Sequence, residues 1–361
     1  YKMPLYYFQV SLLFLAVSDT VANVGGYLVT GNPRFAILQE KKTPVGILGF
    51  TITAFLIALV ILPGSDTAKV FYVLLAVICA IHFEAISYKG SDNLAIPIGT
   101  ALFFRVTHGN DINTLWITSV IIIMAMVSVL LYRSGILTKN GSIAAHLLGI
   151  YIFGILGIEW GIPVAFFFVS STVFTRINGH VNQKFHSAGK RNIWQVMANI
   201  SAGLVFSILF LIFPRQLFIY LFISALAAVT ADTWASEIGP VFQKRCFSLA
   251  KWRKADAGVS GGISIAGTLA SFSGSLLLSI LAWIVFFPVM NIQVVLIITI
   301  SGFLASFADS VLGAFLEPRL EKLNYFKRAA GSESISANDM VNLLASLTAP
   351  LFYLLMSHFF N

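Results

Sequence analysis

The chain has 361 residues, of which 58% are hydrophobic and 11% are charged, and its mean hydropathy is +0.87. A soluble domain of this length cannot bury so much apolar surface, so the composition excludes a soluble globular protein and indicates a polytopic membrane protein. The formal net charge of +8 does not indicate a nucleic-acid partner, because the sequence has no basic soluble segment with interleaved aromatic residues.

Apolar stretches long enough to cross a bilayer follow one another along the whole chain. They predict an all-α fold with about twelve transmembrane helices. In chain order the predicted spans are 5–30, 45–63, 70–88, 94–109, 115–132, 142–158, 161–175, 195–213, 217–239, 261–287, 294–316 and 340–360.

The basic residues gather in alternate loops. Cytoplasmic loops of membrane proteins carry an excess of lysine and arginine. If residues 31–44 are cytoplasmic, 19 of the 23 basic residues fall on that side and both termini lie outside. The loops on the basic side are 31–44, 89–93, 133–141, 176–194, 240–260 and 317–339. The sequence therefore predicts basic cytoplasmic loops that contact lipid headgroups or a bound ligand.

Three aspartates lie in similar apolar, small-residue segments. Asp19 is in LAVSDTVANVGG, Asp232 in AAVTADTWASEIG and Asp309 in LASFADSVLGAFL. A carboxylate in such a place costs about 3 kcal/mol unless a cation or a polar group compensates it, so three similar cases predict a functional role. The residues four positions further, on the same helical face, are the small or amide-bearing Asn23, Ser236 and Gly313.

A basic stretch follows each aspartate: Lys41 and Lys42, then 244–254, then 319–328. Acids beside clustered cations are typical of a divalent metal that holds a phosphorylated substrate. The sequence predicts Asp19, Asp232 and Asp309 as catalytic Mg²⁺ ligands and Glu237 as a further catalytic candidate.

Glycine-rich and serine-rich segments at 41–55 and 260–274 each begin a predicted membrane helix. The free N–H groups of a helix start bind anions, which favours nucleotide phosphates here. Tight helix packing is the alternative role for these small residues. The segment is not a Walker motif, because it lacks the required lysine. The predicted phosphate-binding residues in the second segment and just before it are Gly258, Ser260, Gly261, Gly262, Ser264, Gly267 and Thr268.

The polar stretch HGNDINT ends near residue 114 and predicts a division into units 1–112 and 113–361. In the second unit, the long polar loop before the span at 195–213 predicts further phosphate contacts, with a fully solvated loop as the alternative. These residues are Arg176, Lys190, Arg191, Asn192, Gln195 and Asn199. In the first unit, Lys41 and Lys42 are predicted to bind nucleotide phosphates, with Asp92 and Asn93 as further polar contacts.

The segment from about 120 to 340 resembles the phytyl-phosphate kinase family of membrane proteins. The matching segments are TR at 175–176, GKRNIWQVMAN at 189–199, ADTWASEIG at 231–239, GVSGGISIAGTLAS at 258–271 and SFADSVLGAFLEP at 306–318. This resemblance implies transfer of a phosphoryl group from CTP, or another nucleoside triphosphate, to an isoprenoid monophosphate.

The first unit resembles the last part of a phytol kinase or dolichol kinase, within the CTP-using membrane transferases that include phosphatidate cytidylyltransferase. SDTVANVGG at 18–26, EKKTPVGILGF at 40–50 and SDNLAIPIGTAL at 91–102 carry this similarity. Those kinases have further membrane helices before the aspartate segment. Together the two resemblances imply a two-step enzyme that converts an isoprenoid alcohol to its monophosphate and then to its diphosphate.

Two other functions fit the same residues. A cytidylyltransferase that makes a CDP-lipid would use the same metal and nucleotide groups. A secondary transporter would use the aspartates as proton or sodium sites, but such sites lie near the membrane midplane. The predicted aspartates lie near basic helix ends, which favours the enzyme.

Overall fold

The computed structural model describes residues 4–28, 35–36, 41–64, 67–86, 92–107, 113–181, 190–256, 259–322 and 335–360. The chain forms two compact units, the first comprising Tyr1–Val127 with Gly149–Ile155 and the second Ser128–Leu148 with Leu156–Asn361. The division falls inside helix α6 (Thr114–Arg133), later than the position expected from the polar stretch at 112.

The first unit is a helical bundle. Its first span, Leu5–Leu28, is continuous and changes to a π-helix at η1. The elements are α1 (Leu5–Leu13), η1 (Phe14–Asp19), α2 (Thr20–Leu28), a short pair of strands β1 (Phe35–Ala36) and β2 (Lys41–Lys42), α3 (Pro44–Ile61), α4 (Thr67–Ile86) and α5 (Asp92–Thr107). Large side chains fill its core, and the ring of Tyr7 stacks on Phe104 with centroids 4.8 Å apart.

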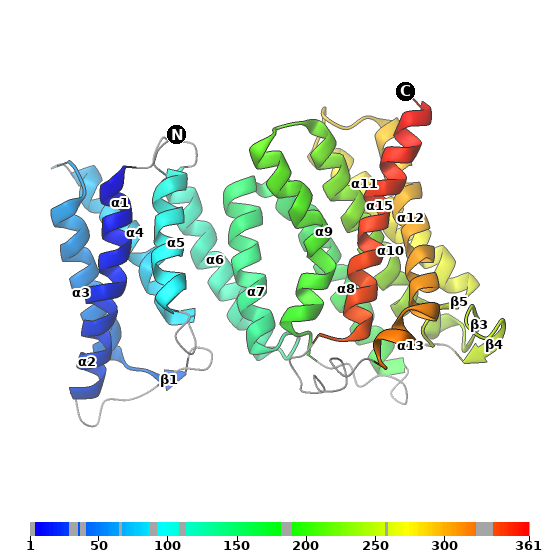
Figure 1. Cartoon of the computed structure of the whole chain (residues 1–361), viewed down its shortest axis with the longest axis horizontal. Coiled ribbons are helices and arrows are strands. Elements are labelled where there is room, and N and C mark those ends of the chain that lie inside the picture. Colours follow the sequence, from blue (N-terminus) through cyan, green and yellow to red (C-terminus); the bar gives the residue numbers. More distant parts are fainter. Residues whose placement is uncertain are drawn as a thin grey trace. The chain divides into compact units, whose positions relative to one another are not determined.

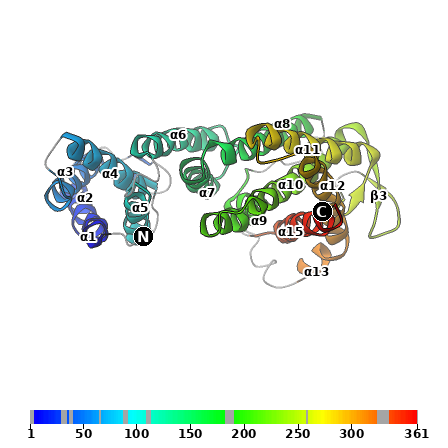
Figure 2. The same ribbon diagram turned by 90° about the horizontal axis from the view of Figure 1, so that it is seen from above.

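The second unit is also helical (Figures 1 and 2). Its elements are α7 (Lys139–Gly149), α8 (Ile158–Val181), α9 (Ile193–Ile212), α10 (Gln216–Phe242), α11 (Ile265–Val285), α12 (Ile292–Phe315), α13 (Glu317–Leu320) and α15 (Ala337–Phe360). Helix α7 continues into η2 (Ile150–Leu156), most of which belongs to the first unit. In the second unit the sheet and α13 lie at one end and the C-terminus at the other, as expected for helices that cross and return (Figure 1).

The structure confirms an all-α polytopic fold. Among the described residues, ten helices are long and apolar enough to cross a membrane. Two predicted spans are not among these ten: 70–88, which corresponds to α4, and 94–109, where α5 contains the shorter apolar stretch Asn93–Phe104.

Helix α10 is the centre of the second unit. Residues 221–231 are buried on every face of the helix, and α10 contacts α8, α9, α11, α12 and α15. Small residues allow close approach: a Cβ atom on Gly302 of α12 would lie 2.7 Å from the Cβ atom of Ala227, and one on Gly267 of α11 would lie 3.2 Å from the carbonyl oxygen of Ala235. Tight helix packing, the alternative role given above for the small residues of this segment, therefore applies at least to Gly267.

The loop between α10 and α11 is a three-stranded antiparallel sheet of order β4-β3-β5, which the sequence did not predict. Its strands are β3 (Arg245–Ser248), β4 (Arg253–Asp256) and β5 (Gly262–Ile263). Helix α11 begins at Ile265, with Ser264 as its N-cap, so the predicted span 261–287 starts four residues too early.

Gly261, which precedes β5, packs this loop against α12. It has a φ of +70°, and a Cβ atom there would lie 2.5 Å from the Cβ atom of Ala314 and 2.7 Å from the carbonyl oxygen of Ser310. Only glycine combines this backbone conformation with such close contact.

We predict that Gly261→Ala destabilises the protein more than Gly135→Ala. Both glycines have positive φ, which costs an alanine about 1 to 2 kcal/mol. A Cβ atom on Gly135 would meet only the Lys190 side chain, at 3.7 Å, whereas one on Gly261 would overlap α12. Thermal unfolding of both variants in detergent measures the difference. Equal losses would contradict close packing of this loop on α12.

Candidate functional site

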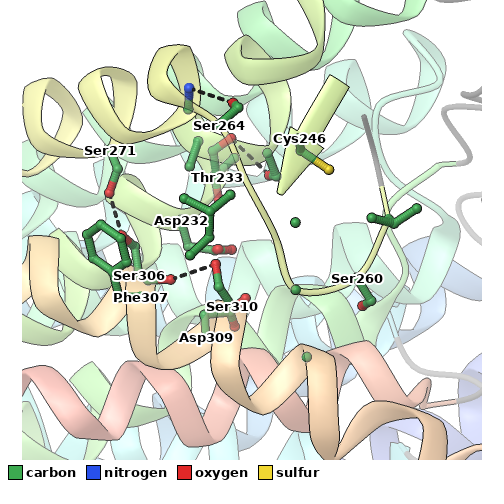
Figure 3. Close-up of a pocket in the computed structure, with 18 of the residues that line it drawn as sticks. Asp232, Thr233, Cys246, Ser260, Ser264, Ser271, Ser306, Phe307, Asp309 and Ser310 are labelled. Carbon is green, nitrogen blue, oxygen red and sulfur yellow. Dashed lines mark hydrogen bonds between the residues drawn. The ribbon is translucent and has the colours of Figure 1, made fainter. Parts of the chain in front are cut away.

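Asp232 and Asp309 face each other in the second unit. Asp232 projects from α10 and Asp309 from α12, and their carboxyl groups are close enough to interact directly (Figure 3). Both side chains are half-buried and line a cavity of about 480 Å³. A volume of this size is typical of a site for a small organic ligand.

Hydroxyl groups, glycines, amides and acids make up most of the cavity wall. Ten of the predicted site residues line it: Asn199, Asp232, Glu237, Ser260, Gly261, Gly262, Ser264, Gly267, Thr268 and Asp309. The remaining described residues of the wall are Thr233, Ala235, Ser236, Pro240, Cys246, Val259, Ile263, Ser271, Ser306, Phe307, Ser310, Gly313, Glu317, Asn338 and Asn342. Gly258 lies outside the described residues.

No lysine or arginine is among the described residues of the cavity wall. The expected phosphate contacts Arg176, Lys190 and Arg191 do not line it. In this respect the structure differs from the predicted site, in which cations neutralise the substrate. Among the described residues, therefore, no cationic side chain of this cavity wall neutralises Asp232 and Asp309.

Arg191 lies in a polar network behind the cavity. Its guanidinium group donates hydrogen bonds to Ser171 Oγ (3.0 Å) and Thr175 Oγ1 (3.1 Å). Thr175 in turn donates to one carboxylate oxygen of Glu237 (2.6 Å), and Asn178 donates to the other (3.0 Å). Burial lowers the pKa of Arg191, and the charge of Glu237 opposes this effect. Arg191 therefore positions Glu237.

The backbone of Arg191 also connects separate segments. Its N–H donates to the carbonyl oxygen of Ile136 (3.0 Å), and its own carbonyl oxygen accepts from Thr138 N (2.9 Å). The neighbouring Lys190 is exposed, with its ammonium nitrogen 5.9 Å from the ring centre of Tyr132. The next two polar residues of the predicted set, Asn192 and Gln195, form a capping box at the start of α9. These residues of the predicted polar loop thus cap the N-terminus of α9.

Two N–H groups at the start of α11 already have side-chain acceptors. Gly267 N donates to Ser264 Oγ (3.0 Å), and Ala266 N donates to the side-chain oxygen of Gln243 (2.9 Å). A phosphate group could take these donors only by displacing both side chains. The expected anion site at this helix start therefore needs a local rearrangement.

Two polar walls of the cavity were missed by the sequence prediction. On α13, Glu317 accepts a hydrogen bond from Ser260 Oγ. On α15, Asn338 and Asn342 line the cavity, and the Asn342 amide nitrogen reaches Asp309 Oδ1 at 3.3 Å when the amide is oriented to donate. The sequence feature that could have predicted the α15 wall is the segment ISANDMVN at 335–342, in which two amides and an acid begin an otherwise apolar span.

A smaller cavity lies on the other side of the acid pair. It has a volume of about 10 Å³, and its wall includes Asn199, Asp232, Asp309, Asn342 and Ser346. This is room for about one water molecule with several polar partners. Its wall also includes Ala228, Val229, Ala305 and Ala345, so this second cavity is more apolar than the first.

The carboxylates and side-chain oxygens fit a hard divalent cation. Mg²⁺ is usually held by one or two carboxylates and keeps several waters or substrate oxygens. Asp232 and Asp309 supply such a pair, with hydroxyl and amide oxygens around them. No cluster of three or more acidic, histidine or cysteine ligands occurs among the described residues, so the protein would supply only part of the coordination.

Asp19 belongs to the first unit, where it ends the π-helix η1. Asn23, one turn further, donates a hydrogen bond to Asp19 Oδ2 (3.1 Å), so the amide at this position compensates the carboxylate. Asn93 is exposed near the start of α5. The side chains of Lys41, Lys42 and Asp92 lie outside the described ones, so their predicted contacts stay predictions.

Comparison with known proteins identifies the class. The profile of a family described as integral membrane protein DUF92 matches residues 122–350. The chain belongs to this family and is an integral multi-pass membrane protein in contact with the lipid bilayer. Every cavity-lining residue, from Asn199 to Asn342, falls inside the matched segment.

Two relatives are uncharacterized membrane proteins. One, from Methanocaldococcus jannaschii, is 27% identical over 229 residues, which cover 63% of this chain and 88% of the relative. Another, from Synechocystis, is 30% identical over 191 residues, which cover 50% of this chain and 72% of the relative. No solved structure matches the chain.

We predict that Arg191→Gln destabilises the protein by about 3 kcal/mol, because it leaves the Glu237 network without its cation. The adjacent Lys190→Gln is the matched control and should change the stability little, since this side chain is exposed. Thermal unfolding of the two variants tests the assignment. If both lose the same stability, or neither does, Arg191 does not act through Glu237.

Proposed function

We propose that the second unit transfers the terminal phosphoryl group of CTP, or another nucleoside triphosphate, to an isoprenoid monophosphate such as phytyl phosphate. The observation that carries the proposal is the pair Asp232 and Asp309, which faces a polar cavity from two adjacent membrane helices. The resemblance of five ordered segments to phytyl-phosphate kinases supplies the substrate class.

In this reaction a phosphate oxygen of the lipid attacks the terminal phosphorus of the nucleotide. The bond between that phosphorus and the bridging oxygen breaks, so the products are a nucleoside diphosphate and a lipid diphosphate. Such a transfer needs positioning and charge neutralisation more than covalent catalysis. The hydroxyl groups of Ser236, Thr268 and Ser310 line the cavity and can donate hydrogen bonds to phosphate oxygens.

The charges of the cavity wall support a metal requirement. Asp232 and Asp309 repel phosphate groups, and the described wall has no lysine or arginine to offset this. Bound Mg²⁺ would neutralise phosphate charge. Asp232 and Asp309 would hold it, while Glu237 stays fixed by Thr175 and Asn178 and shapes the wall behind them.

For the first unit we propose phosphorylation of the isoprenoid alcohol, with Asp19 at the metal and Lys41 and Lys42 at the nucleotide. This assignment rests on the resemblance to phytol and dolichol kinases. Asp92 and Asn93 are the further polar contacts in this proposal.

Two other functions would use the same site residues. A CDP-lipid synthase would release pyrophosphate and leave a CDP-lipid, so product analysis separates it from the kinase. For a transporter, the carboxylates would bind protons or sodium. Asp309 lies six residues before the end of α12, near the sheet end of the unit, and this position favours a site open to a nucleotide.

We predict that Asp232→Asn and Asp309→Asn each lower Mg²⁺-dependent formation of the lipid diphosphate by at least about tenfold, because each removes a ligand charge. Radiolabelled transfer to phytyl phosphate in liposomes measures this. Asp19→Asn is the control, since it lies in the other unit and should spare conversion of supplied monophosphate. Wild-type rates in both cavity variants would remove the metal assignment.

Cys246 offers a binding test that does not need turnover. Its thiol lines the cavity, and burial together with the charge of Asp256 raises its pKa. Less thiolate is then present at neutral pH, so we predict slow alkylation by iodoacetamide at pH 7. The rate should rise by about tenfold per pH unit below the pKa.

In a Cys79→Ser variant, which leaves only this thiol, CTP with Mg²⁺ should slow the alkylation of Cys246, because both would occupy the same cavity. Mass spectrometry at several pH values gives the rates. Unchanged alkylation at saturating nucleotide, in a protein that is folded, would place nucleotide binding elsewhere.

A further inference from the structure

One wall of the cavity changes from polar to aromatic along the contact between α11 and α12. Ser271 of α11 and Ser306 of α12 share a hydrogen bond of 2.5 Å across this contact. Phe307 follows Ser306 and is the only aromatic residue among the described cavity-lining residues. In Figure 3 these three residues lie on the side of Asp232 opposite to Cys246 and Ser260.

The aromatic residues continue from the cavity to the lipid-facing surface. The ring of Phe307 meets that of Phe303 edge to face, with centroids 5.0 Å apart, and Phe303 meets Phe272 in the same way at 5.6 Å. Phe272 is 42% exposed on α11, a helix long enough to span the membrane. The three rings therefore form a continuous path from the acid site to the bilayer.

Helical spacing explains this path. Thr268 lines the cavity, and Phe272 is four residues further on the same face of α11. Phe307 lines the cavity, and Phe303 is four residues earlier on the same face of α12. Phe272 is seven residues into α11, about 11 Å along its axis, which places it within the apolar part of a span.

Further along the two helices, α11 and α12 pack closely and leave no such aromatic path. Ser275 Oγ donates to the carbonyl oxygen of Thr299 (2.8 Å), and Gly302 packs directly against Ser275. The wall formed by α9 and α15 is instead polar, with Asn199, Asn338 and Asn342. The aromatic wall thus offers an apolar route out of the cavity.

We propose that Phe272, Phe303 and Phe307 form a lateral passage for the apolar tail of a lipid phosphate whose head occupies the Asp232 and Asp309 cavity. The substrate class, an isoprenoid phosphate, rests on the proposed function. The bilayer supplies such a lipid from the side, and edge-to-face aromatic contacts are weak enough to open around a hydrocarbon chain. A branched, unsaturated tail also packs well against aromatic faces.

The test uses a long-chain alkyl phosphate with a diazirine in the half of its tail nearer the phosphate, which is the part that would lie between Phe307 and Phe272. The full-length protein is reconstituted in nanodiscs with Mg²⁺, irradiated, digested and analysed by mass spectrometry. We expect adducts on the α11 and α12 peptides that contain Phe272 and Phe303, and we expect phytyl phosphate, but not phytol, to compete. The double variant Phe272→Ala with Phe303→Ala should lower this labelling by at least about threefold.

Leu277→Ala is the matched control, because Leu277 is also a lipid-facing residue of α11 (46% exposed) but lies outside the aromatic path. It should leave the labelling unchanged. Specific labelling of the path without any phosphoryl transfer would retain the passage and reject the proposed reaction. Labelling spread over all lipid-facing helices, or labelling of α9 and α15 that phytyl phosphate reduces, would overturn the passage even if the protein is a kinase.

Discussion

Two carboxylates that face each other within a membrane protein are the constraint on which the rest of the second unit depends. Each aspartate in an apolar span costs about 3 kcal/mol, and like charges at close range add to this cost. The unit meets the cost with polar surroundings, since Asn199 and Asn342 lie beside the acids and hydroxyl groups line the cavity. A divalent cation shared by both acids would remove most of the remaining repulsion.

Close packing of small residues brings the acids together. Gly302 allows α12 to approach Ala227 of α10, and Gly267 allows α11 to approach the end of the same helix. The sheet between α10 and α11 then carries Gly261 against α12 and closes one side of the cavity. A larger residue at any of these glycines would separate helices that must remain in contact for the site to form.

The family relationship and the cavity concern the same part of the chain. The matched segment, 122–350, contains every described residue of the cavity wall. The first unit lies mostly outside this segment. Its Asp19 has a local partner in Asn23.

The sequence by itself determined the membrane class, most of the helices and the two central acids. These features depend on local composition, because a span needs only enough consecutive apolar residues and a buried acid stands out within one. Asn199 and the serine and glycine segment around Ser264, which the sequence assigned to phosphate binding, line the same cavity as the acids, and their binding of phosphate stays a prediction.

Only the tertiary structure decided what the remaining polar residues contact. Arg191 was expected at a phosphate, but Ser171 and Thr175 of α8 bind its guanidinium group. Asn338 and Asn342 are more than one hundred residues from Asn199, yet packing of α15 on α9 places all three at one cavity. A polar side chain in a loop or at a helix end has many possible partners, and long-range helix packing selects among them.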